Sequence, residues 1–335
     1  MQKSGPLKTV VLPVLLLLLL LGLLARFWLS KQEYSFTGPT HITAGSTGVY
    51  LYASGAIFHL SAAGDLLSKV EIARTGLDED PIDLRLLASG ELIIAGQQPA
   101  SLRLCRPESW SCGEIAHGVL AGVKRQFKIL PGRLAGQWLL TDSRGDALWE
   151  WNEGQLALQE RLPPRTLAGP NGLALDVNGH LWIADTDKRR IVEVVPVEEG
   201  WWVTGREHSA VNELTTKERY YPMMLEPASD GRLWVVQAAD FAEAQADLVI
   251  YEPEQGAVAI VGLRDGAYPT DLAVLGDSVL VSDMERFAVY RVDSETEDEL
   301  DGEVVRANIL WALRPVVSLF DPDVCLVLSS IGRRH

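Results

Sequence analysis

The amino-acid sequence predicts an all-β protein, a β-propeller of six or seven four-stranded blades preceded by one N-terminal transmembrane helix. Three observations support this fold. Strand-length apolar segments recur at a nearly constant interval, turn residues separate them, and one long uncharged apolar stretch lies near the N-terminus. The apolar fraction of 47% is ample for a sizeable core in a chain of 335 residues.

The repeat is clearest in an apolar segment that ends at a small or polar residue. Its seven copies end at Ala53, Gly96, Asp142, Asp185, Gln237, Asp283 and Ser330. Successive ends are therefore 43, 46, 43, 52, 46 and 47 residues apart. Each copy follows another strand-length segment, and most are followed by a third and a fourth. Four-strand units with a period of about 40 to 50 residues are typical of propeller blades, which must stack radially to bury their faces.

The number of blades depends on how the ring closes. Seven candidates for the inner strand favour seven blades, the last completed by an N-terminal strand near Tyr34 to Phe36. In the alternative, six blades close the ring and the C-terminal pair of segments is an appendage.

The N-terminus predicts a membrane anchor over residues 9–29, because roughly 20 apolar residues suffice to cross a bilayer. Residues 1–8 form a basic tail, residues 30–38 a linker or closing strand, and residues 39–335 the propeller. A cleaved signal peptide is the alternative to an anchor. The basic flank should stay in the cytoplasm, which places the propeller on the periplasmic or extracellular side.

The charge of the chain argues against one class of partner, and its cysteines offer one possible disulfide. The net charge of −15 is spread through the chain without a basic stripe, so nucleic acid is a poor partner. A short hairpin over "RLCRPESWSC" would place Cys105 opposite Cys112, where a disulfide is possible; two buried thiols are the alternative. Cys325 is expected in the core.

One copy of the repeat resembles a known family closely. The stretch "GPNGLALDVNGHLWIADTDKRRIVEV", from Gly169 to Val194, is similar to an NHL repeat and to the corresponding repeat of senescence-marker-protein/gluconolactonase and strictosidine-synthase-like propellers. Those families are six-bladed. The lactonase-like members hold a divalent cation in the channel, and the resemblance implies Asn171 as one ligand. Their other ligands do not carry over, because "TGPTHITA" lacks a glutamate and Met223 replaces an aspartate.

The loops that precede each first strand and those that follow each second strand should emerge on one face of the propeller. We expect this face to bind a ligand or partner, through candidates that are mostly charged or aromatic: Asp142, Arg144, Asp185, Asp187, Lys188, Arg189, His208, Tyr220, Tyr221, Asp283 and Arg286. His208 is expected in the longest loop, from Gly205 to Tyr221.

The recurring aspartates at the ends of second strands invite a catalytic interpretation. Their recurrence instead favours a structural role within each blade, because turns must repeat whereas catalytic groups need not. No catalytic residue and no cofactor are predicted. The leading hypothesis is a membrane-anchored scaffold that binds a protein or a small ligand. The alternative is a metal-dependent lactonase or related hydrolase, for which calcium is the possible cation.

Overall fold

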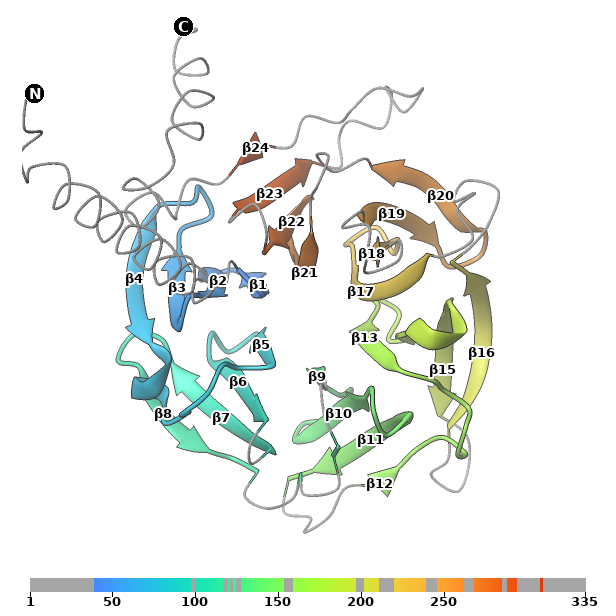
Figure 1. The fold of residues 1–335 in the computed structure, drawn as a ribbon, viewed down its shortest axis with the longest axis horizontal. Coiled ribbons are helices and arrows are strands. Elements are labelled where there is room, and N and C mark those ends of the chain that lie inside the picture. Colours follow the sequence, from blue (N-terminus) through green and yellow to red (C-terminus); the bar gives the residue numbers. More distant parts are fainter. Residues whose placement is uncertain are drawn as a thin grey trace, which may run out of the picture. The chain divides into compact units, whose positions relative to one another are not determined.

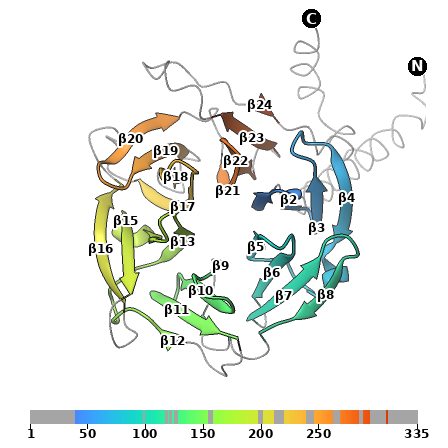
Figure 2. The ribbon, with the colours of Figure 1, turned by 180° about the vertical axis from the view of Figure 1, so that it is seen from behind.

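A computed structural model describes residues 39–97, 100–116, 120, 123–124, 128–153, 159–196, 202–210, 220–238, 246–261, 268–284, 288–293 and 308–309. These residues form six four-stranded antiparallel sheets around a common axis (Figure 1). The view from behind shows the same ring of sheets (Figure 2). The predicted β-propeller is therefore confirmed, with six blades.

Within each blade the four strands pair in chain order, from the axis outward. Blades one to three contain β1 (His41–Gly45), β2 (Gly48–Ala53), β3 (Ala56–Leu60), β4 (Leu66–Glu71), β5 (Asp83–Leu86), β6 (Leu92–Gln97), β7 (Ala100–Arg106), β8 (Ser111–Glu114), β9 (Ile129–Pro131), β10 (Gln137–Asp142), β11 (Ala147–Asn152) and β12 (Gln159–Glu160). Blades four to six contain β13 (Pro170–Leu175), β14 (Leu181–Asp185), β15 (Arg190–Pro196), β16 (Trp202–Ser209), β17 (Tyr221–Pro227), β18 (Leu233–Ala238), β19 (Ala246–Glu252), β20 (Gly256–Val261), β21 (Pro269–Leu275), β22 (Ser278–Asp283), β23 (Ala288–Asp293) and β24 (Asn308–Ile309). Two short 3₁₀ helices, η1 (Ile72–Thr75) and η3 (Thr186–Lys188), connect strands.

The second strand of each blade carries the repeat found in the sequence. β2 and β22 are buried along their whole length, whereas the outer strand β4 is mostly exposed. Second strands are buried on both faces because each blade packs against its neighbours. One core cluster joins Trp234 and Val236 of blade five to Leu272 and Val279 of blade six. A sheet with one buried face alternates apolar and polar residues, whereas these strands, buried on both faces, are continuous apolar runs.

The preference for seven blades was wrong. Blade one packs directly on blade six, in a cluster that joins Leu51 to Ala273 and Leu280. The Ile42 amide donates to Asp271 Oδ2 at 3.3 Å, and Thr270 Oγ1 donates to the Pro39 carbonyl oxygen at 2.9 Å. These contacts close the ring without another blade. The seventh candidate, residues 326–330, and the closing strand near residues 34–36 lie outside the described residues.

The predicted membrane anchor, residues 9–29, also lies outside the described residues, as does Cys325. Within the part of the chain that is described, no helix combines the length and the apolar character needed to cross a bilayer.

The hairpin of β7 and β8 has the register expected from the sequence. Cys105 lies directly opposite Cys112, and Arg106 lies opposite Ser111. The two cysteines form a disulfide with a Cα–Cα distance of 4.0 Å. Cys105 is fully buried in the cluster between blades one and two. The disulfide thus braces the outer hairpin of blade two.

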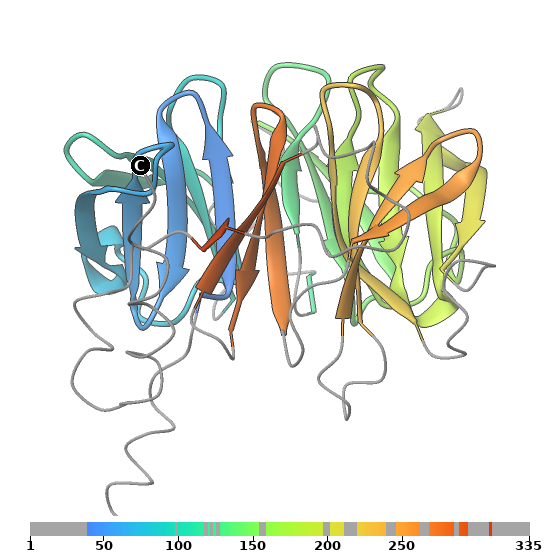
Figure 3. The same cartoon turned by 90° about the horizontal axis from the view of Figure 1, so that it is seen from above.

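The strands alternate in direction, so the loops divide between two faces. Loops that join one blade to the next, and loops between second and third strands, emerge on one face, which we call the entry face. The remaining turns lie on the opposite face. A view from the side shows both sets of loops (Figure 3).

Candidate functional site

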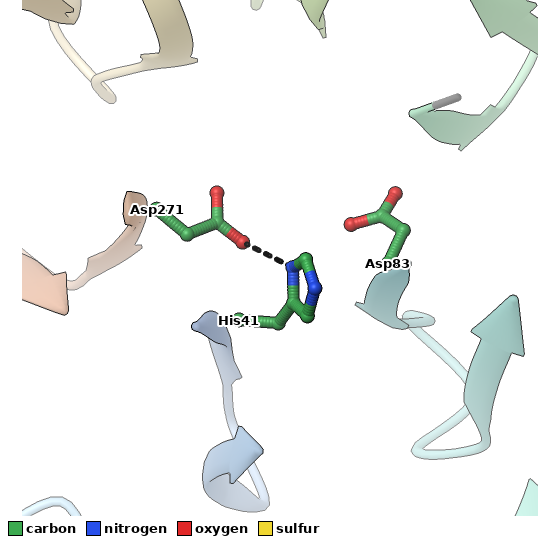
Figure 4. A group of neighbouring side chains, drawn as sticks. All are labelled: His41, Asp83 and Asp271. Carbon is green, nitrogen blue, oxygen red and sulfur yellow. Dashed lines mark ion pairs between the residues drawn. The ribbon is translucent and has the colours of Figure 1, made fainter. Parts of the chain in front are cut away.

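Side chains at the start of the first strands meet at the axis of the propeller. His41 begins β1, Asp83 begins β5, and Asp271 lies near the start of β21. Figure 4 shows these three side chains converging from separate strands. Each offers one possible ligand atom, and the three atoms lie within 4.8 Å of one another.

Lys128, which immediately precedes β9, reaches into this group. Its Nζ lies 2.8 Å from Asp83 Oδ1 and 2.9 Å from Asp271 Oδ2. All three side chains are almost fully buried, with exposed fractions of 7%, 0% and 5% respectively. Lys128 therefore links three blades at the axis: its own third blade, the second and the sixth.

Backbone amides orient both carboxylates. Asp83 Oδ2 accepts from the Ile129 amide at 2.9 Å, and Asp271 Oδ2 accepts from the Ile42 amide at 3.3 Å. Each contact crosses from one blade to the next. The two aspartates thus fasten neighbouring blades together as well as holding the ammonium.

The electrostatics favour the charged forms of Asp271 and Lys128. Burial disfavours the charge on Asp271, but the Lys128 ammonium outweighs it and holds the pKa of Asp271 well below its usual range. Burial likewise opposes the charge on Lys128, yet Asp271 and Asp83 raise its pKa. The Lys128–Asp271 ion pair is therefore stable at neutral pH. His41 Nδ1 lies 3.7 Å from Asp271 Oδ2, which is longer than a hydrogen bond.

A second ion pair spans the channel. Arg85, two residues after Asp83 on β5, pairs with Glu226 on β17. Blades two and five lie on opposite sides of the ring (Figure 1). Burial raises the pKa of Glu226, although the Arg85 guanidinium opposes that effect. Apart from His41, the three carboxylates and two cationic groups of the channel leave one negative charge.

His41, Asp83 and Asp271 have the chemistry of metal ligands, so we tested whether a divalent cation fits among them. Metal ligands must surround the ion at about 2.0 to 2.6 Å. Lys128 Nζ already lies at hydrogen-bonding distance from both carboxylates, so the ion and the ammonium would compete for one place. A resident divalent metal does not fit while Lys128 keeps this position.

Asn171, the predicted metal ligand, lies on β13 and takes part in contacts between blades. Its side-chain amide donates to Thr186 Oγ1 at 2.9 Å, and its backbone carbonyl oxygen accepts from Thr141 Oγ1 at 2.9 Å. Thr186 Oγ1 in turn donates to the Pro222 carbonyl oxygen at 2.7 Å. These bonds connect blades three, four and five, so Asn171 contributes to the rigidity of the ring.

The three strand-end aspartates are fully buried and hold the entry segments of their own blades. Asp142 accepts from the Lys124 and Gly145 amides, at 2.9 and 2.8 Å. Asp185 accepts from the Ala168 amide at 2.6 Å and from Arg190 Nε at 2.7 Å. Burial raises the pKa of Asp185, and these donors oppose that effect.

Asp283 repeats the arrangement, since it accepts from the Tyr268 amide at 3.2 Å and from the Tyr290 hydroxyl at 2.9 Å. In all three blades a carboxylate at the end of the second strand binds the backbone just before the first strand. The contacts are those of the structural role that recurrence favoured.

Several predicted residues gather on the entry face of blades three to five. Lys188 Nζ donates to the carbonyl oxygens of Arg165 and Thr166, at 2.8 and 2.6 Å. Arg189 donates to the Tyr221 hydroxyl at 3.1 Å and lies over its ring, 4.9 Å from the centroid. Asp187, Lys188 and the more distant Arg144 are exposed, and Arg286 lies outside the described residues.

The expected position of His208 in a long loop was wrong. It lies in β16, opposite Ile191, because this strand continues to Ser209. Its ring stacks on Trp182, and Nε2 lies 2.9 Å from the Pro253 carbonyl oxygen in the turn between β19 and β20. That turn belongs to the face opposite the entry face. Tyr220 is also buried, with its hydroxyl on Asp247, and burial raises its pKa.

Sequence reasoning missed the channel cluster, although a signal for it was present. His41, Asp83, Lys128 and Asp271 occupy the same place in their blades as Asn171 does in blade four, at the entry to the first strand. A comparison of that position across the copies would have shown a polar or charged residue in five of the six blades, with Met223 in the fifth.

Comparison with known proteins supports the fold. No protein-family model and no curated protein matches the chain. Among solved structures it is similar to a putative gluconolactonase, with a TM-score of 0.58 and 14% identity over 82% of this chain and 90% of that chain. It is also similar to an inactive histidine-to-alanine variant of virginiamycin B lyase from Staphylococcus aureus with quinupristin (TM-score 0.53, 15% identity, 82% and 84% covered). A chain of a nidogen/laminin complex matches with a TM-score of 0.53 and 14% identity over 77% and 90%. The chain therefore has the propeller fold of gluconolactonase-like and NHL-type proteins.

Proposed function

We propose that this protein is a membrane-anchored binding propeller, whose entry face takes an anionic group of a protein or small-molecule partner outside the cytoplasm. This proposal rests on the observation that the buried aspartates of the channel and of the strand ends are already held by donors from the protein itself. Asp83 and Asp271 are held by Lys128, and Asp142, Asp185 and Asp283 are held by donors of their own blades. A hydrolase needs such groups as metal ligands or bases, and here they stabilise the scaffold.

The location of positive charge supports an anionic partner. Four basic residues on the entry face of blades three and four, Arg144, Arg165, Lys188 and Arg189, form a patch that we call the basic arc. Only Asp146 and Asp187 oppose them in the same loops, and Asp146 accepts from the Gly169 amide at 2.8 Å. The arc is thus locally positive in a chain with a net charge of −15. Guanidinium groups favour carboxylate and phosphate partners.

The experiment is crosslinking in native membranes followed by mass spectrometry of the captured partner. Wild type is compared with Arg144→Glu/Arg165→Glu, which reverses two exposed charges of the arc. Arg133→Glu is the matched control, because it reverses an exposed arginine in the β9–β10 turn of the opposite face.

We expect wild type and the control to capture the same partner and the arc variant to lose it. Equal capture by all three proteins would refute a role for the basic arc. No capture by any of them, together with lactone hydrolysis by the purified propeller, would favour the alternative of a calcium-dependent lactonase with Asn171 as a ligand.

The membrane anchor and the compartment are tested separately. The Cys105–Cys112 disulfide supports an oxidising compartment, where such bonds persist. In sealed membrane vesicles the propeller should resist protease added from the cytoplasmic side. Digestion from that side would refute the placement, and release of the propeller by a carbonate wash would refute the anchor.

A further inference from the structure

We infer that the Lys128 ammonium is the resident cation of the channel, in the place of a divalent metal, and that its removal opens a metal site formed by His41, Asp83 and Asp271. The resemblance to metal-containing propellers implied a divalent cation in the channel, with Asn171 as a ligand. The channel of this chain instead carries its own tethered charge.

The geometry places the ammonium between the two carboxylates that a metal would bind. The three candidate ligand atoms lie within 4.8 Å of one another, so an ion among them would contact all three after a small contraction. Lys128 Nζ is 2.8 and 2.9 Å from the two carboxylates. The site is also preorganised, because the Ile129 and Ile42 amides donate to the two carboxylates and orient them, as groups around a metal centre commonly do.

His41 completes the donor set. Its Nδ1 is buried and, among the described residues, has no hydrogen-bond partner. One imidazole nitrogen and two carboxylates form a ligand set that suits Co²⁺, Zn²⁺, Mn²⁺ or Fe²⁺. A nitrogen that is buried without a partner is costly for the fold, and a metal bond would satisfy it.

The charge of the channel points to the same exchange. With Lys128 present, a divalent cation would turn the single excess negative charge into an excess positive one, inside a buried site. Without Lys128, two negative charges remain and a divalent cation would neutralise them. The wild-type channel should therefore reject divalent ions, and the variant should attract them.

The experiment measures Co²⁺ binding by the visible absorption of the bound ion and by the shift of the unfolding midpoint. The proteins are wild type, Lys128→Ala, Lys128→Ser and the triple variant Lys128→Ala/Asp83→Asn/Asp271→Asn. Lys124→Ala is the matched control, because Lys124 precedes the same strand but its side chain is exposed.

We expect one Co²⁺ per chain in Lys128→Ala and Lys128→Ser, with an affinity at least about tenfold tighter than in wild type, Lys124→Ala or the triple variant. Co²⁺ should raise the unfolding midpoint of the two single variants only. If these variants do not fold alone, refolding with Co²⁺ should recover them.

Two results would overturn the inference. One is stoichiometric binding by wild type that depends on Asp83 and Asp271. The other is a failure of both Lys128 variants to bind Co²⁺ or to be recovered by it. Neither result bears on the basic arc, so this test and that of the proposed function can fail separately.

Discussion

Asp271 is the residue whose replacement should weaken the closure of the ring most. Its Oδ2 accepts from the Ile42 amide of blade one at 3.3 Å and from Lys128 Nζ of blade three at 2.9 Å. It therefore connects the last blade to the first and to the opposite side of the channel. Asp271→Asn keeps the shape of the side chain and removes its charge.

The expected loss of stability follows from the burial of both Asp271 and Lys128. The variant leaves the Lys128 ammonium with Asp83 as its one remaining carboxylate, in a site where the lysine is only 7% exposed. Breaking a buried pair on one side typically costs about 3 to 5 kcal/mol. Because Asp83 still holds the ammonium, we expect a loss near the lower limit, about 3 kcal/mol of the free energy of unfolding.

Urea unfolding followed by tryptophan fluorescence measures this loss, since the chain contains ten tryptophans. Asp277→Asn is the matched control: Asp277 lies in the β21–β22 turn of the same blade and is exposed. The control should change the free energy of unfolding by no more than about 0.5 kcal/mol. If Asp271→Asn is no less stable than Asp277→Asn, the channel ion pairs do not hold the ring together.

Three further predictions concern pH, a close contact and the disulfide. Because the pKa of Asp271 is lowered in the folded state, its contribution to the free energy of unfolding is present above about pH 4 and is lost as the pH falls. The difference in stability between wild type and Asp271→Asn should therefore shrink when urea unfolding is repeated at acid pH, and a constant difference would contradict this. Gly172→Ala should cost about 1 to 3 kcal/mol in the same urea assay, because its Cβ would lie 2.9 Å from the Met223 carbonyl oxygen, whereas Gly113→Ala meets nothing within 4 Å and should be neutral; equal effects would refute the close contact. Reduction of the Cys105–Cys112 disulfide, checked by thiol titration, should cost about 2 to 3 kcal/mol and leave the fold intact; loss of the fold would show that the disulfide decides it.

The sequence predicted the fold well because each blade is local. All four strands of every blade come from one contiguous stretch, so apolar runs and turn residues determine them before any long-range contact forms. The second strand ending at Asp185 and the third strand beginning at Arg190 both fall where the repeat placed them. The close approach of blades four and five at Gly172 also agrees with the glycine of the Pro-Asn-Gly motif.

The blade number and the channel could not be predicted in the same way. The apolar segment ending at Ser330 has the spacing and the apolar character of the repeat. Only the packing of blade one on blade six shows that six blades close the ring. The contact of Lys128 with Asp271 spans 143 positions, so no local pattern connects them. His208 was misplaced because the polar stretch "GREHS" continues β16, in which paired backbone amides and a neighbouring blade outweigh the low strand propensity of these residues.

The double-mutant cycle of Lys128 and Asp271 tests the central claim, that the channel is held by ion pairs which fasten the blades, most directly. The free energy of unfolding is measured for wild type, Lys128→Met, Asp271→Asn and the double variant. The account predicts a coupling free energy of at least about 2 kcal/mol. The double variant should lose less free energy of unfolding than the sum of the losses in the two single variants. Additive losses, within about 0.5 kcal/mol, would contradict it.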